Sequence, residues 1–563
     1  MAATLVVGVL LAWSPVAERK APPLDRADDD GYPIRNARVI DRCSRCHVVD
    51  DEDRMSRISY LRKTPEGWQT SVRRMVALHG VRLNAADARE IVRYLSNEQG
   101  LAPEELRPGL FEVERRIIDH DYEGDSGVEF TCIQCHSMGR VITQRRTEEE
   151  WGLLLATHRA LYPLVDFQAF RRSGPPPEEG DPRHPMDQAI EHLSEAFPLE
   201  SSEWSAWAAT KRSPRLAGTW TLSGYEPGKG PVYGTVIIAA DGSDPDAFTS
   251  SSSYVYAESG ERVSRSGQAL VYTGYQWRGR SNPDAPDERR EVMFVERDQR
   301  EMSGRWFRGD YDEIGADVTL RRLGSDPMVA GVYPTALERG GSVDITIFGG
   351  GLGASSVSAT DLDFGAGVSV ASVAGADDGT ITVRLTIDDE AVIGGRDLFA
   401  FGSTQEDAVM IHDGVDRIEV TPRTGMARVG GVAFPKGYET FEAIGWDDGP
   451  DGERDTDDDL RLGRVDVTWR VEEYAAVYGD DDIRFVGNMR QDGVFDPAAD
   501  GPNPERAGNR NNIGDVWVVA THARPGSSDL SARAHLIVTV PLYMRFEPWR
   551  PIDDGRRASE SDR

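Results

Sequence analysis

The spacing of apolar residues predicts that roughly the first 210 residues are mainly helical. Apolar side chains recur at helical intervals in Leu83–Leu95, with Asn84 as a candidate N-cap. Met186–Phe197 shows the same pattern. Two more helices are expected to start at Thr64 and Thr147, because each threonine precedes an acidic residue two positions later.

From Pro214 onward the pattern changes to short β-type runs separated by Gly, Asp and Ser turns, which predicts barrels or sandwiches. A second β unit begins near Met328, and its segment Gly340–Gly349 resembles immunoglobulin-like domains of the transcription-factor/plexin type. A third unit begins near Val415. The strands expected in the first and third units are Ala217–Leu222, Thr235–Ile238, Leu270–Trp277, Glu291–Val295, Asp317–Leu320, Arg464–Trp469 and His535–Val540.

All four cysteines lie in two C-x-x-C-H motifs, Cys43–His47 and Cys132–His136. In this motif two thiols add to the vinyl groups of a c-type haem, and the adjoining histidine binds the iron. A single Cys₄ zinc site would also use four thiols, but it gives the two histidines no role. We therefore predict two covalently bound haems, attached through Cys43, Cys46, Cys132 and Cys135 and ligated by His47 and His136.

The helical part contains an internal repeat. Arg62–Trp68 matches Arg145–Trp151 in two basic residues, a threonine, a glutamate and a tryptophan. Each unit has a haem motif, a linker, a tryptophan-containing helix, another linker and a C-terminal helix. This order is the outline of two tandem class I cytochrome c modules.

The repeat also suggests the sixth ligand of each iron. Seven residues, about two helical turns, separate Trp68 from Met75 and Trp151 from His158. We therefore expect His47/Met75 ligation of one haem and His136/His158 ligation of the other. A methionine ligand raises the reduction potential relative to a second imidazole. The competing ligands are Met55 and His79 for the first haem, and Met138 and Met186 for the second.

These patterns predict a multidomain fold, in which an all-α dihaem cytochrome c domain precedes three all-β domains of barrel or immunoglobulin-like sandwich type. No nucleophile–base pattern or catalytic carboxylate pair stands out in the β part, so no catalytic residue is assigned. The expected boundaries are 1–17 for a signal peptide, 33–212 for the dihaem domain, 213–325 for a β-barrel-like domain, 326–412 for an immunoglobulin-like domain, 413–545 for a β-sandwich and 546–563 for a polar tail.

The chain is strongly acidic, with 95 Asp and Glu against 64 Lys and Arg and a formal net charge of −31. This balance argues against a nucleic-acid partner, because phosphate binding requires basic surface. It favours solubility and a basic or exposed-haem redox partner. An acidic surface that reflects only the habitat of the host is the alternative interpretation.

The apolar run Met1–Trp13 has the length of a secretory h-region and is too short to span a bilayer, although no Lys or Arg precedes it. We expect cleavage near Ser14–Ala17. Covalent haem attachment is completed outside the cytoplasm, which agrees with a leader. The expected mature protein is periplasmic and has no membrane span.

Several short strings are distinctive: Ser56–Ser59, Arg62–Trp68, Asn97–Pro103, Pro198–Ser201, Tyr275–Gly279, Gly493–Phe495 and Gly501–Arg506. Together they resemble the large, haem-bearing alpha subunit of the quinohemoprotein amine dehydrogenases, over essentially the whole chain after the leader. The resemblance implies a dihaem domain with three β domains. It also implies a β-propeller subunit and a small subunit with cysteine tryptophylquinone, where primary amines are oxidised. Electrons would pass to a soluble acceptor such as a blue copper protein or cytochrome c, and this chain alone would not oxidise amines.

Two alternatives remain at this point. The chain could be a free-standing dihaem electron-transfer protein whose β domains bind another partner. The acidic segment Asp447–Asp459, where the sequence departs from the family, could hold calcium, but it lacks EF-hand spacing and a solvated loop is the competing interpretation.

Overall fold

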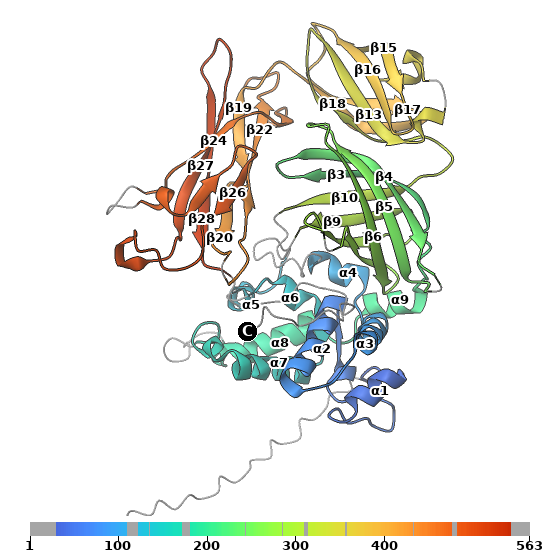
Figure 1. Cartoon of the computed structure of the whole chain (residues 1–563), viewed down its shortest axis with the longest axis vertical. Coiled ribbons are helices and arrows are strands. Elements are labelled where there is room, and N and C mark those ends of the chain that lie inside the picture. Colours follow the sequence, from blue (N-terminus) through green and yellow to red (C-terminus); the bar gives the residue numbers. More distant parts are fainter. Residues whose placement is uncertain are drawn as a thin grey trace, which may run out of the picture.

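A computed structural model describes residues 30–541, apart from 110–121, 134–135, 172–180, 243, 284, 309–313, 355–356, 432 and 476–480. Helices dominate the N-terminal part, and several β-sheets follow it (Figure 1). The predicted fold class is therefore confirmed. The predicted signal peptide 1–17, the polar tail 546–563 and Cys135 lie outside the described residues. Within the described residues, every helix is too short or too polar to cross a bilayer.

The four helices predicted from the sequence are all present as α2, α3, α7 and α8. Their predicted N-caps are also correct, since Thr64 accepts a hydrogen bond from the Gly67 amide, Asn84 from that of Asp87, and Thr147 from that of Glu150. The helices are α1 (Ala37–Cys43), α2 (Pro65–His79), α3 (Ala85–Glu98), α4 (Pro103–Leu106), α5 (Ser126–Cys132), α6 (Gly139–Ile142), α7 (Glu148–Leu161), α8 (Pro185–Ala196) and α9 (Ser202–Thr210), with short 3₁₀ turns at Ile58–Tyr60, Arg107–Gly109 and Pro163–Asp166.

The sequence repeat is also a structural repeat. Short strands β1 (Leu61–Lys63) and β2 (Gln144–Arg146), one from each unit, pair antiparallel. The two tryptophan side chains make equivalent bonds: Trp68 Nε1 donates to the carbonyl oxygen of Gln99 at 3.0 Å, and Trp151 Nε1 to that of Phe197 at 3.3 Å. Both acceptors are C-caps, of α3 and α8. Each tryptophan therefore joins its helix to the last helix of its own unit.

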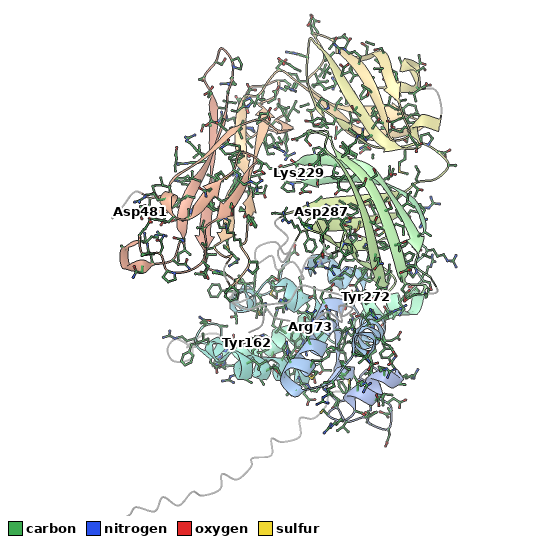
Figure 2. All side chains as sticks on the ribbon, viewed as in Figure 1. Arg73, Tyr162, Lys229, Tyr272, Asp287 and Asp481 are labelled. Atoms are coloured by element: carbon green, nitrogen blue, oxygen red, sulfur yellow. The ribbon has the colours of Figure 1, made fainter. Side chains whose placement is uncertain are left out.

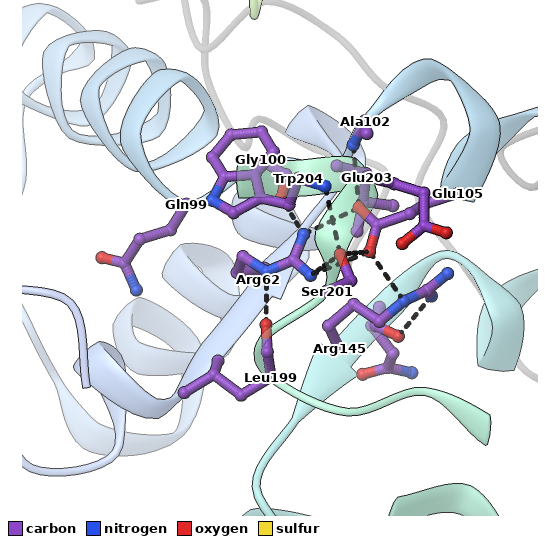
Figure 3. Close-up of polar contacts among 12 residues, drawn as sticks. Arg62, Gln99, Gly100, Ala102, Glu105, Arg145, Leu199, Ser201, Glu203 and Trp204 are labelled. Carbon is purple, nitrogen blue, oxygen red and sulfur yellow. Dashed lines mark hydrogen bonds and ion pairs between the residues drawn. The ribbon is translucent and has the colours of Figure 1, made fainter. Parts of the chain in front are cut away.

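A buried ion network joins the two units (Figure 3). Arg62 and Arg145 are directly opposite each other in the β1–β2 pair, and both donate to the carboxylate of Glu105. Glu105 also accepts from Ser201 Oγ at 2.7 Å and the Ala102 amide at 2.8 Å. The network therefore fixes the repeat interface to the segment that leads into α9.

Eight antiparallel strands form a closed barrel, with β10 pairing with β3 to complete it. The helical part packs against this barrel, because Leu106 and Trp204 share one hydrophobic core with barrel residues such as Trp220 and Trp277. The strands are β3 (Gly218–Glu226), β4 (Gly230–Ala240), β5 (Ala247–Tyr256), β6 (Arg262–Tyr272), β7 (Gln276–Ser281), β8 (Arg289–Val295), β9 (Glu301–Phe307) and β10 (Gly315–Arg322).

The next unit is a sandwich of two four-stranded sheets around one core. Its first sheet has the order β11-β13-β16-β15, and its second β12-β18-β17-β14. The strands are β11 (Met328–Tyr333), β12 (Ala336–Glu338), β13 (Ser342–Gly350), β14 (Leu362–Asp363), β15 (Val368–Ala376), β16 (Thr380–Ile387), β17 (Gly394–Ala400) and β18 (Ser403–His412), with 3₁₀ turns at Leu352–Ala354 and Ala359–Asp361.

The last unit contains three small sheets, ordered β19-β22-β23, β20-β28-β27-β24 and β21-β26-β25. Its strands are β19 (Arg417–Thr421), β20 (Thr424–Arg428), β21 (Glu439–Thr440), β22 (Glu442–Asp447), β23 (Leu460–Arg464), β24 (Thr468–Glu473), β25 (Gly487–Met489), β26 (Val494–Pro497), β27 (Gly514–His522) and β28 (Leu530–Thr539), with 3₁₀ turns at Asp482–Arg484 and Ala507–Asn509.

Two of the predicted strands were wrong as continuous strands. Leu270–Trp277 crosses a hairpin turn between β6 and β7, where Thr273 and Gly274 have φ of 57° and 79°. Two successive residues in the left-handed region reverse the chain. Arg464–Trp469 spans the end of β23 and the start of β24, which belong to different sheets.

Candidate haem sites

The first C-x-x-C-H motif starts at the C-terminal end of α1. The side chain of Asn36 caps the start of this helix by accepting from the Arg38 and Val39 amides. After the helix, the amides of Cys46 and His47 donate to the carbonyl oxygen of Cys43 at 3.1 and 3.0 Å. This tight turn holds the two thiols and the histidine within one short loop.

The imidazole of His47 is oriented by a backbone group. Its Nδ1 lies 2.8 Å from the carbonyl oxygen of Ser56. A carbonyl oxygen can only accept, so Nδ1 carries the proton and Nε2 keeps its lone pair for a metal. Burial, with a smaller contribution from the neighbouring Cys46, raises the pKa of Cys43 to about 11. This thiol is therefore protonated at neutral pH and is not a preformed metal-binding thiolate.

The second motif repeats this arrangement. It begins at Cys132, the last residue of α5, and Asp125 caps that helix by accepting from the Val128 amide. Burial raises the pKa of Cys132 to about 12. Among the described residues, no three His, Cys, Asp or Glu side chains gather as a metal-binding group. Cys43, Cys46 and Cys132 are therefore not gathered into one group in this structure.

His136 and His158 both line a cavity of about 780 Å³. The cavity volume is within the range of about 300–1,000 Å³ typical of cofactor sites. The two ring centroids are 6.4 Å apart. A metal bound between two imidazoles has metal–nitrogen bonds of about 2 Å, and each nitrogen lies about 1 Å from the centre of its ring. The two ring centroids are then roughly 6 Å apart. Cys132 and Trp151 also line this His136–His158 cavity.

The protonation of both rings fits iron binding. Nδ1 of His136 lies 2.9 Å from the Ser137 carbonyl oxygen, and Nδ1 of His158 lies 2.9 Å from that of Leu154. Each Nδ1 is therefore a donor, which leaves Nε2 with a lone pair. Burial lowers the pKa of His136 to about 4 and also lowers that of His158. Both rings are neutral at pH 7, the form that coordinates metals. Tyr162, labelled in Figure 2, lies beside His158 with 6.2 Å between ring centroids.

The other candidate ligands are in different environments. Met138 is fully buried in the hydrophobic core around Trp151, and neither Met138 nor Met186 lines the His136–His158 cavity. Met55 is likewise fully buried, in the core around Trp68. The remaining candidates lie on α2, where Met75 is half-buried and His79 is exposed. The ligation of both irons therefore stays a prediction, but the geometry of the second site favours His158.

Sequence analysis missed the basic residues of the His136–His158 cavity. Lys63, Arg74, Arg140 and Arg146 all contribute to its lining. Lys63 and Arg146 occupy equivalent positions of the repeat, and this correspondence was the sequence signal that could have indicated a shared role. Their shared cavity could not be inferred because it depends on how the two units pack.

The acidic segment Asp447–Asp459 contains an arginine partner that sequence analysis did not identify. Arg417 pairs with Asp448 at 3.1 Å and also with Asp459. Asp447 and Asp448 are buried, so the segment is not simply a solvated loop. Two carboxylates of this segment are therefore paired with a guanidinium.

Several solved structures match parts of this chain. Two designed β-barrels, one redesigned and one fluorescence-activating, match at 13% and 18% identity. Both matches cover 19% of this chain. The redesigned barrel is covered over 92% of its own chain with a TM-score of 0.17, and the fluorescence-activating barrel over 93% with a TM-score of 0.16. The protocadherin GammaB4 extracellular domain matches at 11% identity, covering 56% of this chain and 62% of its own, with a TM-score of 0.16. These scores are too low to carry an argument. The comparison with curated proteins gives no match.

Family models are more informative. Residues 35–181 match the haem-binding model of the quinohemoprotein amine dehydrogenase alpha subunit. Residues 213–323, 326–413 and 418–548 match the models for domains II, III and IV of the same subunit. The four matches follow one another along most of the chain. The chain therefore belongs to the family of quinohemoprotein amine dehydrogenase alpha subunits, and its helical part is the haem-binding domain.

Proposed function

We propose that this chain is the periplasmic electron-transfer subunit of a quinohemoprotein amine dehydrogenase. It relays electrons from a cysteine tryptophylquinone on a small partner subunit to a soluble acceptor, such as a blue copper protein or cytochrome c. A β-propeller subunit completes the heterotrimer. The observation that carries the proposal is that His136, His158 and Cys132 line one cavity, with the two imidazole centroids 6.4 Å apart, in a domain of the haem-binding family.

The residues of the chain divide the work of holding two c-type haems. Cys43 and Cys46 would attach one haem, and Cys132 and Cys135 the other. His47 and His136 would each bind one haem iron, and Met75 and His158 would supply the second protein ligand of the first and second iron, respectively. Each bound haem iron exchanges one electron, so two sites match a two-electron quinone donor. The backbone carbonyls that orient His47, His136 and His158 keep their Nε2 atoms available.

The chain should retain two covalently bound haems after denaturation, when it is produced in a host that matures c-type cytochromes. Its four cysteines provide four thioether bonds, two for each haem. Mass spectrometry of the denatured chain gives the stoichiometry. The double variant Cys132→Ser/Cys135→Ser should keep one haem. A single haem in the unmodified chain, or bound zinc, would contradict the assignment.

Replacing Met75 by alanine should abolish the weak near-infrared band of methionine–iron ligation and lower one midpoint potential. The other potential should change little, because His136 and His158 supply nitrogen ligands from a different cavity. Magnetic circular dichroism and redox titration measure both effects. His79→Ala is the matched control on the same helix. If His79→Ala removes the band and Met75→Ala does not, the tryptophan-based alignment of the repeats is wrong.

The second candidate function is that of a free-standing dihaem electron-transfer protein. The subunits that copurify with this chain distinguish this function from that of an amine dehydrogenase subunit. Purification from its native host should yield a propeller subunit and a small quinone-bearing subunit in equal amounts with this chain. Recovery of the chain without either one would favour the free-standing function.

A further inference from the structure

Lys63 is a buried cation without a carboxylate partner among the described residues. Lys63 is 9% exposed. The ammonium group donates to Ser71 Oγ at 2.7 Å and lies 5.7 Å from the ring centroid of Trp68. A hydroxyl and an aromatic face stabilise an ammonium group much less than a carboxylate does. A buried ammonium in this setting is costly unless an anion binds beside it.

The charges around Lys63 increase this cost. Arg146, Arg74 and Arg57 all repel its ammonium group, and Glu150 is the carboxylate that opposes them. Glu150 is itself shared by Arg57 at 2.7 Å and Arg146 at 3.6 Å. Burial, followed by the repulsion of these arginines, holds the pKa of Lys63 well below its ordinary value. Lys63 and these three arginines therefore leave an excess of positive charge around Glu150, and both Lys63 and Arg146 are buried.

Three of these cations face the same space. Lys63, Arg74 and Arg146 line the cavity between His136 and His158. A haem carries two propionate carboxylates on one edge, so a haem ligated by these histidines would bring two negative charges into the cavity. Two added carboxylates would offset most of the positive excess.

We propose that Lys63, together with Arg74 and Arg146, forms a carboxylate-binding site for the two propionates of the haem held by His136 and His158. This inference rests on the proposed haem in that cavity. The second haem site then depends on the first repeat unit, because Lys63 and Arg74 belong to the first unit whereas both histidines belong to the second. A cation beside a haem favours the ferrous form, whose net charge is lower by one.

The test is the variant Lys63→Met in the haem-loaded chain, because methionine keeps the length of the side chain and removes its charge. At a fixed applied potential, the ferrous-to-ferric ratio of the bis-histidine haem should fall about tenfold, which is about 59 mV for a one-electron couple. The other haem should change little. Lys63→Arg should restore the ratio. Redox-difference infrared spectra with ¹³C-labelled propionates should show altered carboxylate bands in Lys63→Met and wild-type bands in Lys63→Arg.

The matched control is Lys229→Met. Lys229 also lies over an aromatic ring, 4.4 Å from the Tyr256 centroid, but Figure 2 places it at the end of the barrel away from the helices. Wild-type potentials and carboxylate bands in Lys63→Met would overturn the inference. If Lys63→Met does not load haem, the test uses Arg74→Gln, at a half-buried position of α2. This variant must show the same fall in the ferrous-to-ferric ratio and the same change in the carboxylate bands, and wild-type values would overturn the inference. A wild-type chain without haem at the second motif would instead refute the proposed function.

Discussion

The isolated chain is expected to take up electrons from dithionite and to stay oxidised when primary amines are added. In the proposed function, amines are oxidised at a cysteine tryptophylquinone on a partner subunit, and building such a quinone on this chain would require a cysteine that is not attached to haem. All four cysteines of this chain lie in C-x-x-C-H motifs. We therefore expect complete haem reduction of the isolated chain by dithionite and no haem reduction by primary amines.

Anaerobic mixing with a panel of primary amines, followed by haem absorbance, measures this difference. Adding the propeller and small subunits should make reduction depend on amine, which shows that the haems in the preparation are competent. The isolated chain with dithionite is the second control. Prompt reduction of the isolated chain by any amine would mean that it contains a catalytic site of its own.

Local patterns were sufficient to predict the helical repeat. The caps Thr64, Asn84 and Thr147 and the apolar spacing behind them act within a few residues, so the sequence carries their structural signal directly. The β-type runs were less reliable because apolar and β-branched composition does not reveal a tight turn. Thr273 is such a case: its positive φ is set by the hairpin rather than by any preference of threonine.

The contacts between repeat units could not be read from the sequence. Glu105 lies outside the repeated strings, yet it binds Arg62 and Arg145 from both units. Lys63 was part of the repeat motif, but its position in the cavity of the other unit depends on the β1–β2 pairing. Such long-range contacts need a three-dimensional arrangement that spacing rules do not supply.

The barrel helps to position the helix shared by the two candidate haem sites. Arg278 of β7 donates to Glu66 at 2.6 Å, and both side chains are buried. Glu66 lies in the first turn of α2, where a carboxylate also interacts favourably with the helix dipole. The same helix carries Arg74, which lines the His136–His158 cavity, and Met75, the proposed ligand of the other iron. The barrel therefore stabilises an element on which both sites depend.

Replacing Glu105 by glutamine is expected to destabilise the helical part by about 3 kcal/mol at neutral pH, because it leaves buried arginines without their countercharge. Arg62 is fully buried and makes two 2.8 Å bonds to this carboxylate, and Arg145 adds a third at 3.1 Å. Glutamine keeps the size of the side chain but removes its negative charge. Chemical unfolding followed by Soret circular dichroism reports on this part of the multidomain chain alone.

The pH dependence of unfolding provides a second readout. Burial alone would raise the pKa of Glu105, but its hydrogen bonds and charge interactions with Arg62 and Arg145 hold that pKa at about 2, below the ordinary 4.5. A carboxylate with a lowered pKa contributes its full stability above the ordinary value and loses it as the pH falls toward the folded one. The wild-type chain should therefore lose stability between about pH 4.5 and 2 more steeply than Glu105→Gln. The control is Glu104→Gln at the exposed neighbouring position, which should unfold like the wild type. Equal stability of Glu105→Gln and Glu104→Gln at neutral pH would show that the Glu105 network does not hold the two repeat units together.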